Sequence, residues 1–364
     1  MLVAPDDDPG NRIADADGPP GVDVRLVSVP AQRDSAPARI RRRLLWLKDA
    51  PGASRRVRRA LVADAELWRI VGQADLIELH FNYSLAFLDQ VRRVAPRTPV
   101  VAVIYEVFSA SLASRRRHGS RLRRAEAAIL LPRARRAERR LLNRVSAIRV
   151  LADRDRDALR SLGVSRPIEV LPPWVDPVPA VQVSADETVL FVGALWRWEN
   201  LHGVEWLLRE VWPTVRRRRP AARLVLAGAG PPAALLDTHA AGVTVTGFVS
   251  DLAPYYAAAR CVVAPVQVGG GIQVKVPQAM LHGLPVVATT FSAAGLGDHD
   301  ARDALAGVHD SAEAFAGTVV ELLTDRHGAE EAGARARALA LTRWSADAYS
   351  ERLLSTYAGF QPRG

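Results

Sequence analysis

Three consecutive glycines followed by a lysine form the part of the chain best suited to bind a phosphate group. Residues 267–290 read QVGGGIQVKVPQAMLHGLPVVATT, with Gly269, Gly270 and Gly271 after a strand pattern and Lys275 beside a helix pattern. Glycine lets a ligand approach the backbone closely, and amide groups at a helix start favour anions. Lys275 can place a positive charge on the same phosphates. The stretch matches neither standard phosphate motif and contains no carboxylate, so any catalytic acid or base must come from elsewhere.

Two polar residues in the first half of the chain follow predicted strands. His80 comes after ADLIEL, and Glu106 comes after PVVAVIY. Ligands of parallel α/β sheets bind beside the carboxyl ends of the strands, so either side chain could face a cleft. A purely structural role, as a capping or hydrogen-bonded polar residue, fits each of them equally well.

The predicted elements that position these residues alternate between strands and helices, which indicates parallel sheets with crossover helices. Strands are predicted over 22–29, 74–79, 98–104, 146–150 and 167–171, and then in TVLFVG, RLVLAGAG, VTVTGF, CVVAPV and PVVATT. A long basic helical segment over 113–143 is predicted to break near Pro132. The proline-rich stretch 172–183 is predicted to be an extended linker, and helices are predicted over 311–324, 328–342 and 345–357. The chain of 364 residues is therefore predicted to form two doubly wound α/β domains.

The net charge of +10 comes largely from clustered arginines, which attract anions. The clusters lie at 39–43, 55–59, 115–124 and 216–219. No nucleic-acid-binding motif accompanies them, so we expect no specific nucleic-acid partner. Arginine serving as ordinary surface charge explains the clusters, and contact with an anionic membrane surface is the main alternative.

The remaining composition gives no sign of export or membrane insertion. No apolar run is long enough for a membrane helix, and the acidic N-terminus lacks the pattern of a secretory signal. The single cysteine, Cys261, excludes a disulfide framework within one chain. We therefore expect a cytoplasmic protein, in contact with the inner face of the cell membrane if the arginine clusters bind lipid.

The second half of the chain resembles the nucleotide-sugar-binding domain of GT-B glycosyltransferases, most closely the retaining enzymes of glycosyltransferase family 4. The resemblance runs in order through FVGALWRWENLHGVEWLLREVWPTV, RLVLAGAGPP, VTVTGFVSDLAPYYAAARCVVAPV and the glycine stretch, and continues into RWSADAYSERLLSTY. The first half matches more loosely, through ADLIELHFNYS, PVVAVIYEVFS and IEVLPPWVD. The resemblance implies an acceptor-side domain over 1–176, a linker over 177–183, a donor domain over 184–344 and a C-terminal helix over 345–364 that crosses back to the first domain. It implies a GT-B fold, in which two Rossmann-like domains face a cleft.

The resemblance also implies roles for individual residues. Those implied to bind the donor are Gly193, Gly228, Gly230, Phe248, Val249, Gly270, Gly271, Ile272, Lys275 and Gln278. Phe248 and Val249 would meet the nucleobase, Lys275 the diphosphate and Gln278 the ribose. The implied catalytic residues are Lys275, Arg197 and Glu106, and the implied acceptor-side residues are His80, Tyr105 and Glu106.

Several positions depart from the family pattern. Gly270 and Gln278 stand where two glutamates are common, and Tyr105-Glu106 stands where a His-Asp pair is common. Pro277 predicts that the helix begins near Val276, which leaves Lys275 on the loop or cap. The usual N-terminal strand, glycine loop and helix are predicted to be absent or shortened before residue 22.

The resemblance implies transfer of a hexose from a UDP-, GDP- or dTDP-sugar to a polysaccharide, lipid-linked or small-molecule acceptor. Such transfer is usually described as a front-face, retaining reaction, so we expect neither a metal site nor a permanently bound cofactor. A bacterial enzyme of cell-envelope or polysaccharide biosynthesis is expected. Two alternatives stay open: a catalytically silent homologue that binds nucleotides or acts as a partner subunit, and a nucleic-acid-binding protein supported by charge alone.

Overall fold

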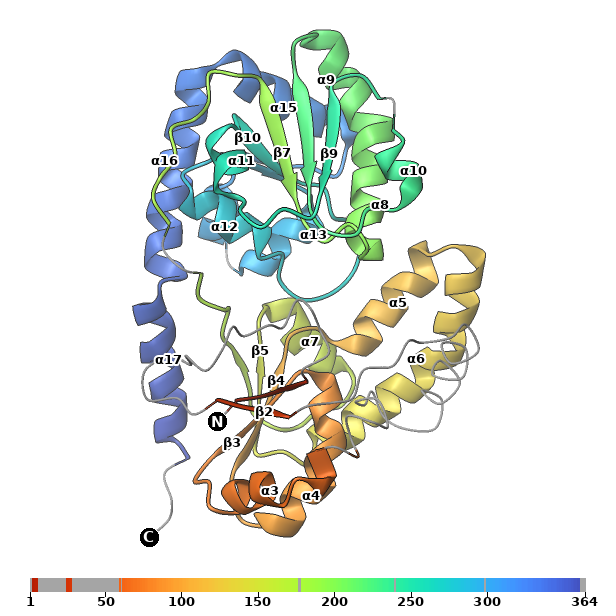
Figure 1. Ribbon diagram of the computed structural model, residues 1–364, viewed down its shortest axis with the longest axis vertical. Helices are drawn as coiled ribbons and strands as arrows, with labels where there is room; N and C mark the ends of the chain where they lie inside the picture. Colours follow the sequence, from red (N-terminus) through yellow and green to blue (C-terminus); the bar gives the residue numbers. More distant parts are fainter. Residues whose placement is uncertain are drawn as a thin grey trace.

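The computed structural model describes residues 2–5, 24–27, 59, 61–175, 178–238, 240–297 and 299–360. Two α/β domains lie end to end, and a long C-terminal helical segment runs along one side of both (Figure 1). Each domain is built on a parallel sheet, as the alternation of strands and helices predicted.

The first domain contains a four-stranded parallel sheet in the order β3-β4-β5-β6. Its strands are β3 (Ile77–His80), β4 (Val100–Ile104), β5 (Ala147–Val150) and β6 (Ile168–Val170). The accompanying helices are α3 (Ala65–Gly72), η1 (Asn82–Phe87), α4 (Leu88–Val94) and α7 (Asp153–Ser161). All five residues of β4 are buried because this strand lies inside the sheet and is apolar on both faces.

A separate pair of short parallel strands, β1 (Leu2–Pro5) and β2 (Val24–Val27), belongs to the N-terminal part of the chain. A strand therefore does precede residue 22, where the sequence predicted an absent or shortened one, and it is four residues long. The predicted loss of the glycine loop and helix concerns residues 6–23, which lie outside the described part of the chain.

Two basic helices, α5 (Phe108–His118) and α6 (Arg121–Leu142), form a hairpin that projects from the first domain (Figure 1). The predicted break near Pro132 is wrong, because Pro132 lies inside α6 and the chain turns at Gly119 instead. Pro132 and the residue one turn before it, Ala128, are both exposed. Water can therefore satisfy the carbonyl that loses its partner, and the helix continues through the proline.

The second domain contains a six-stranded parallel sheet in the order β12-β11-β10-β7-β8-β9. Its strands are β7 (Thr188–Val192), β8 (Arg223–Ala227), β9 (Val243–Gly247), β10 (Cys261–Ala264), β11 (Val286–Ala288) and β12 (Gly307–Val308). The chain extends the sheet from β7 in one direction through β8 and β9, and in the other through β10 to β12. The strand order therefore reverses between β7 and β10, which is where doubly wound sheets form their ligand crevice.

Helices cover both faces of this sheet (Figure 1). They are α8 (Trp198–Trp206), η2 (Leu207–Val211), α9 (Trp212–Arg218), α10 (Ala233–Leu236), α11 (Ala253–Ala257), α12 (Lys275–Leu281), α13 (Thr290–Ala293), η3 (Ala294–Leu296), α14 (His299–Asp303) and α15 (Ala312–Thr324). The core of the second domain includes Val204 of α8, Val211 of η2 and Val215 of α9, as their helical spacing predicted.

The two domains are joined twice. Within the described residues of the linker, the chain has no helix or strand between β6 and β7, as its prolines predicted. The second connection consists of α16 (Arg326–Arg343) and α17 (Ala346–Ala358), and α17 lies against the first domain (Figure 1). Trp174 of the linker packs its ring on Tyr349 of α17, with ring centroids 4.9 Å apart. Helix α17 thus lies against the first domain.

Candidate active site

The glycine loop and Lys275 lie at the carboxyl ends of β10 and β7, at the switch point of the second sheet. Helix α12 begins at Lys275 itself, so the prediction that the helix starts near Val276 and leaves Lys275 outside it is wrong by one residue. Pro277 occupies the first turn as predicted, because its missing N–H costs nothing where no intrahelical partner exists. Because the helix starts at this residue, the side chain of Lys275 lies against Gly193 in the loop that follows β7.

Lys275 is buried and held in one position. Its Nζ donates a hydrogen bond of 2.6 Å to Asn200 Oδ1 and lies 4.5 Å from the centre of the Phe191 ring. Burial, together with the nearby positive charge of Arg197, lowers the pKa of the ammonium group to about 7. A buried cation with a lowered pKa and no carboxylate partner among the described residues is suited to bind an anion, because an anion would restore its ordinary protonation.

The floor beside Lys275 is made of backbone. A Cβ added to Gly193 would lie 2.9 Å from Lys275 Nζ, and one added to Gly228 would lie 1.8 Å from the Gly193 carbonyl oxygen. Gly228 has φ of 156° and Gly230 has φ of 65°, where it packs against Trp196. These three glycines, which the family resemblance assigned to donor binding, lack side chains that would collide. The turns after β7 and β8 can therefore approach each other and the ammonium group of Lys275.

The glycine loop contacts the first domain. A Cβ on Gly270 would lie 2.7 Å from Glu106 Cγ, and one on Gly271 would lie 2.5 Å from the Tyr105 carbonyl oxygen. The structure therefore brings the predicted donor loop directly against the predicted acceptor-side residues Tyr105 and Glu106.

Glu106 forms a charged contact across the cleft. Its Oε2 lies 3.4 Å from Nη2 of Arg197, whose Nε lies 3.7 Å from Oε2 of Glu199. Glu106 Oε1 is buried and has no hydrogen-bond partner among the described residues. The glycine stretch has no carboxylate of its own, but it lies against Glu199 of its own domain at Gly269 and against Glu106 of the first domain, which keeps one oxygen able to accept a hydrogen bond.

Two further carboxylates hold the segment around Glu106, and sequence reasoning missed both. Glu138 of α6 accepts hydrogen bonds from the backbone N–H of Phe108 at 2.8 Å and of Ser109 at 3.2 Å. Asp155 of α7 accepts backbone hydrogen bonds from Gly271 and Val107. Burial raises the pKa of Glu138 to about 7 and that of Asp155 to about 6. Their partners are backbone amides of distant segments, so no local pattern indicates them.

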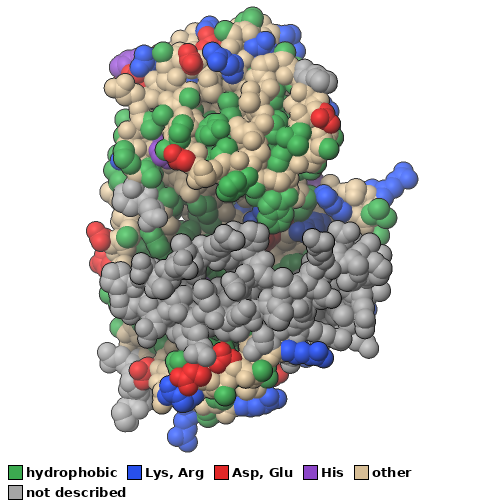
Figure 2. Space-filling model, viewed as in Figure 1, with side chains coloured by type: hydrophobic (Ala, Val, Ile, Leu, Met, Phe, Trp, Pro, Cys, Tyr) green, Lys and Arg blue, Asp and Glu red, His purple; other side chains and the backbone are tan. Residues whose placement is uncertain are grey.

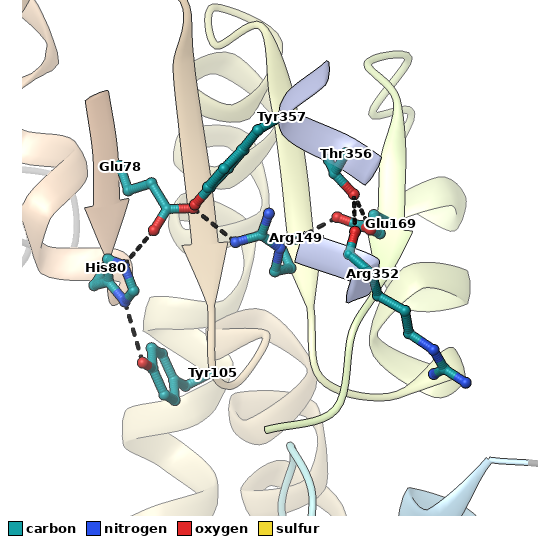
Figure 3. Close-up of polar contacts among 8 residues, drawn as sticks. All are labelled: Glu78, His80, Tyr105, Arg149, Glu169, Arg352, Thr356 and Tyr357. Carbon is teal, nitrogen blue, oxygen red and sulfur yellow. Dashed lines mark hydrogen bonds and ion pairs between the residues drawn. The ribbon is translucent and has the colours of Figure 1, made fainter. Parts of the chain in front are cut away.

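A polar network continues from the cleft into the first sheet (Figure 3). His80 Nδ1 lies 3.1 Å from the Tyr105 hydroxyl oxygen, and His80 Nε2 lies 2.9 Å from Glu78 Oε2. Glu78 also pairs with the buried Arg149 at 2.6 Å. Burial alone would raise the pKa of Glu78, but hydrogen bonds from His80 and Tyr357 and the charge of Arg149 outweigh it and hold the pKa at about 2.

Helix α17 completes this network. Tyr357 donates a hydrogen bond to Glu78, and Thr356 donates one to Glu169, which itself lies 3.2 Å from Arg149 Nε. The end of the chain therefore supports the side chains that lead to Tyr105 (Figure 3).

The other predicted donor residues surround the cradle at different distances. Ile272 packs against Gly295, and Gln278 lies one turn after Lys275 in α12. Phe248 and Val249 follow β9, and Phe248 is 76% exposed. The structure therefore leaves the predicted base-binding residue Phe248 outside the buried surroundings of Lys275.

The comparisons with known proteins agree with this geometry. Residues 16–178 match the family described as Glycosyltransferase Family 4, and residues 186–325 match the family described as Glycosyl transferases group 1. The two matches follow one another along the chain and correspond to the two domains. The chain belongs to the group 1 glycosyltransferases.

Solved structures similar to this glycosyltransferase share its GT-B fold. Sucrose-phosphate synthase from Thermosynechococcus elongatus superposes with a TM-score of 0.66 at 19% identity, covering 83% of this chain and 78% of that one. HepE of Anabaena in complex with UDP gives a TM-score of 0.61 at 17% identity, covering 81% of each chain. WaaG, a glycosyltransferase involved in lipopolysaccharide biosynthesis, gives 0.53 at 17% identity, covering 77% and 82%. No curated protein sequence matches the glycosyltransferase.

None of the helices in the described ranges combines the length and the apolar character needed to cross a bilayer. Within the same ranges, no three His, Cys, Asp or Glu side chains of the glycosyltransferase gather as metal ligands would.

Proposed function

We propose that this glycosyltransferase moves a hexose from a nucleotide sugar to an acceptor, with retention of configuration. The observation that carries the proposal is Lys275, a buried ammonium group beside the backbone turn at Gly193. A nucleotide sugar presents a diphosphate as its leaving group, and a buried cation at this edge of the sheet can stabilise the negative charge that develops on it. The homologous HepE structures contain UDP and UDP-glucose, which supports a donor of this class.

In the proposed reaction the bond from C1 of the sugar to the diphosphate oxygen breaks, and a bond from C1 to the acceptor oxygen forms on the same face. The acceptor proton passes to the departing diphosphate, so no protein nucleophile is needed. Lys275 and Arg197 stabilise the charge that develops on the leaving group, and the transfer proceeds without a metal ion. Glu106 orients hydroxyl groups between the two substrates.

Calorimetric titration with UDP-glucose, GDP-mannose and dTDP-glucose tests the proposal. UDP-glucose does not titrate near pH 7, so the pH dependence of Kd reports on the protein. Lys275 with its pKa of about 7 is charged below that pH, and binding holds its proton above it. Kd is therefore expected to be constant below pH 7 and to rise by about tenfold per pH unit above it. Absence of binding by all three donors at pH 6.5 would contradict the proposal.

A catalytically silent homologue is the second candidate, and the substitutions at Gly270 and Gln278 favour it. Such a protein would bind the nucleotide sugar without breaking the bond between the sugar and the diphosphate, so no free nucleotide would form. Release of UDP from UDP-glucose by the wild-type chain, measured with a coupled assay and lost in Lys275→Ala, decides against this candidate. Binding without any release decides for it.

We further propose that the enzyme works at the cytoplasmic face of a bacterial membrane, in envelope or polysaccharide synthesis. The α5–α6 hairpin, residues 108–142, contains eleven arginines and two glutamates. Leu122 is 85% exposed and Ile129 is 53% exposed on it, and basic side chains project from its free end in Figure 2. Exposed apolar side chains among cations suit an anionic lipid surface.

Sedimentation with vesicles tests this location. Vesicles containing phosphatidylglycerol are expected to bind the enzyme at low salt, and pure phosphatidylcholine vesicles are not. Leu122→Ser is expected to reduce the bound fraction, while Val62→Ser, at an exposed apolar position outside the hairpin, is the control. Equal binding to both kinds of vesicle would exclude the electrostatic contact.

A further inference from the structure

Three aromatic side chains form a continuous stack where β3 and β4 end. The Phe81 ring lies parallel to that of Tyr105, with centroids 4.2 Å apart and 15° between the planes. It also lies parallel to the ring of Tyr83, with centroids 5.3 Å apart and 10° between the planes. Phe81 is 41% exposed and Tyr83 is 47% exposed. Large aromatic surface is thus kept in water at the edge of the sheet where ligands bind.

The backbone at Phe81 is strained. Phe81 has φ of 65° and ψ of 153°, a conformation that is almost confined to glycine, and no other non-glycine residue in the described ranges has positive φ. The surrounding hydrogen bonds enforce it. The Phe81 N–H donates to the Val103 carbonyl at 2.9 Å, and the Phe81 carbonyl accepts from the hydroxyl group of Ser84 at 2.7 Å. The fold therefore imposes a cost to present this ring, and such strain is concentrated at functional sites.

Polar groups surround the stack. The Tyr105 hydroxyl group is hydrogen-bonded to His80, and Asn82 Nδ2 donates to the Glu106 carbonyl at 2.8 Å. Asn82 Oδ1 is buried and has no hydrogen-bond partner within the described part of the chain. Apolar rings bordered by unsatisfied or neutral polar groups are typical of sites for uncharged, hydroxyl-bearing ligands.

The stack adjoins the donor cradle without sharing its charge. The Tyr105 carbonyl faces Gly271 of the glycine loop, so the stack begins where the cradle ends. The carboxylates nearest to it are Glu78 and Glu106, and Arg149 behind it is buried between Glu78 and Glu169. The local charge therefore disfavours a phosphorylated or carboxylated ligand.

We propose that the stack of Phe81, Tyr83 and Tyr105 forms the acceptor subsite and binds an uncharged pyranose ring against the outer faces and exposed edges of its rings, with Phe81 holding the two tyrosine rings in place. A pyranose has an apolar C–H face that packs on an aromatic ring and a rim of hydroxyl groups that would meet His80, Asn82 and Glu106. A hydroxyl group held there would face the sugar of a donor bound at Lys275. That the bound saccharide is the acceptor rests on the proposed transferase function. Saccharide binding by the stack does not depend on that function.

Saturation-transfer NMR on the full chain tests the proposal with maltotriose, cellotriose and chitotriose as uncharged probes. Glucose 6-phosphate and octanoate serve as charged and lipid-like probes. At least one trisaccharide is expected to receive signal from the aromatic protons, and its Kd is expected to rise by about fivefold or more in Phe81→Gly and Tyr83→Ala. Val62→Ala, an exposed apolar position elsewhere in the first domain, is expected to leave the Kd unchanged.

The variant Phe81→Gly separates a binding role from a structural one. Glycine accepts the backbone conformation without strain, so the Tm is expected to stay within about 2 °C of the wild type or to rise. Calorimetric binding of UDP-glucose is expected to be unchanged in this variant. Saccharide binding that is lost with folding and donor binding intact supports the subsite.

Three results would overturn the proposal: no trisaccharide binds, a trisaccharide binds equally well to Phe81→Gly, or only glucose 6-phosphate or octanoate binds. Failure of the wild type to bind any nucleotide sugar would instead overturn the proposed function. In that case saccharide binding lost in Phe81→Gly still identifies the stack as a saccharide site.

Discussion

The two walls of the cleft are built from different parts of the polypeptide. The proposed donor wall is largely main chain: glycines at 193, 228 and 271 let backbone segments approach closely, and the buried Lys275 beside Gly193 is held by the side chain of Asn200. The acceptor wall consists of side chains, with Glu106, His80 and the stacked rings standing on the ends of β3 and β4.

This difference matches the chemistry of the two substrates. A diphosphate is common to UDP-, GDP- and dTDP-sugars, and a buried cation recognises its charge without contacting the sugar or the base. Acceptors differ, and side chains can be exchanged without rebuilding the fold. The donor wall is therefore expected to be intolerant of substitution, whereas the acceptor wall is expected to change specificity first.

The largest effect is expected at Lys275. Lys275→Ala removes the buried cation, and transfer to any acceptor is expected to fall by about 10²- to 10³-fold. Steady-state kinetics measures the loss, and calorimetry separates donor binding from the chemical step. Lys275→Arg is not expected to rescue it, because Gly193 leaves no room around Nζ for a guanidinium group. Full activity in Lys275→Arg would show that the cradle is looser than its distances indicate.

The next effect concerns stability and contrasts the walls directly. Gly228→Ala would place a Cβ 1.8 Å from the Gly193 carbonyl oxygen, and it is expected to lower the free energy of unfolding by about 3 kcal/mol or more. Tyr83→Ala on the acceptor wall is expected to cost less than about 1.5 kcal/mol. Urea unfolding measures both, and equal costs would contradict the contrast.

A smaller effect is expected where the walls touch. Gly270→Ala would place a Cβ 2.7 Å from Glu106 Cγ and is expected to raise the KM for the donor by about tenfold. In the double variant with Glu106→Ala the clash is gone. The effects of the two changes on the KM for the donor, expressed as free energies, are therefore expected to deviate from additivity by about 1 kcal/mol. Additive effects would mean that the domains do not close as the structure places them.

The smallest effect is expected in the network behind the acceptor wall. Glu78 has a folded-state pKa of about 2, below its ordinary value of 4.5, so its contribution to stability is complete above pH 4.5 and is lost as the pH falls towards 2. Tyr357→Phe removes a hydrogen bond to this carboxylate and is expected to cost about 1 kcal/mol at neutral pH and less at pH 3. Urea midpoints at pH 7 and pH 3 measure the difference, and a cost that grows on acidification would contradict it.

The two proposed walls differ in how much of them the sequence indicates. Gly271 and Lys275 stand out because glycines and a lysine beside a strand-to-helix turn act through local geometry, whereas Gly193 was implied only by the family resemblance. Asn200, which holds Lys275, and Asp155, which meets the glycine loop, act across 75 and more residues of chain. No local pattern carries such contacts.

The same limit explains the errors in the fold. Pro132 was predicted to break a helix because proline removes a hydrogen bond, but the exposure of that position depends on how the α5–α6 hairpin is placed. Phe81 was overlooked because its strain is a property of the backbone and not of the residue type. In both cases the deciding quantity is tertiary.

The docking of α17 on the first domain has a consequence for synthesis of the protein. Tyr357 and Thr356 are synthesised after every strand of both sheets, yet they complete the hydrogen bonds of Glu78 and Glu169 beside the buried Arg149. The first domain emerges early but cannot close its polar interior until α17 has been made. A chain that stops short of α17 therefore carries an incompletely closed first domain, which gives cellular proteases a means to remove it before it can bind a substrate.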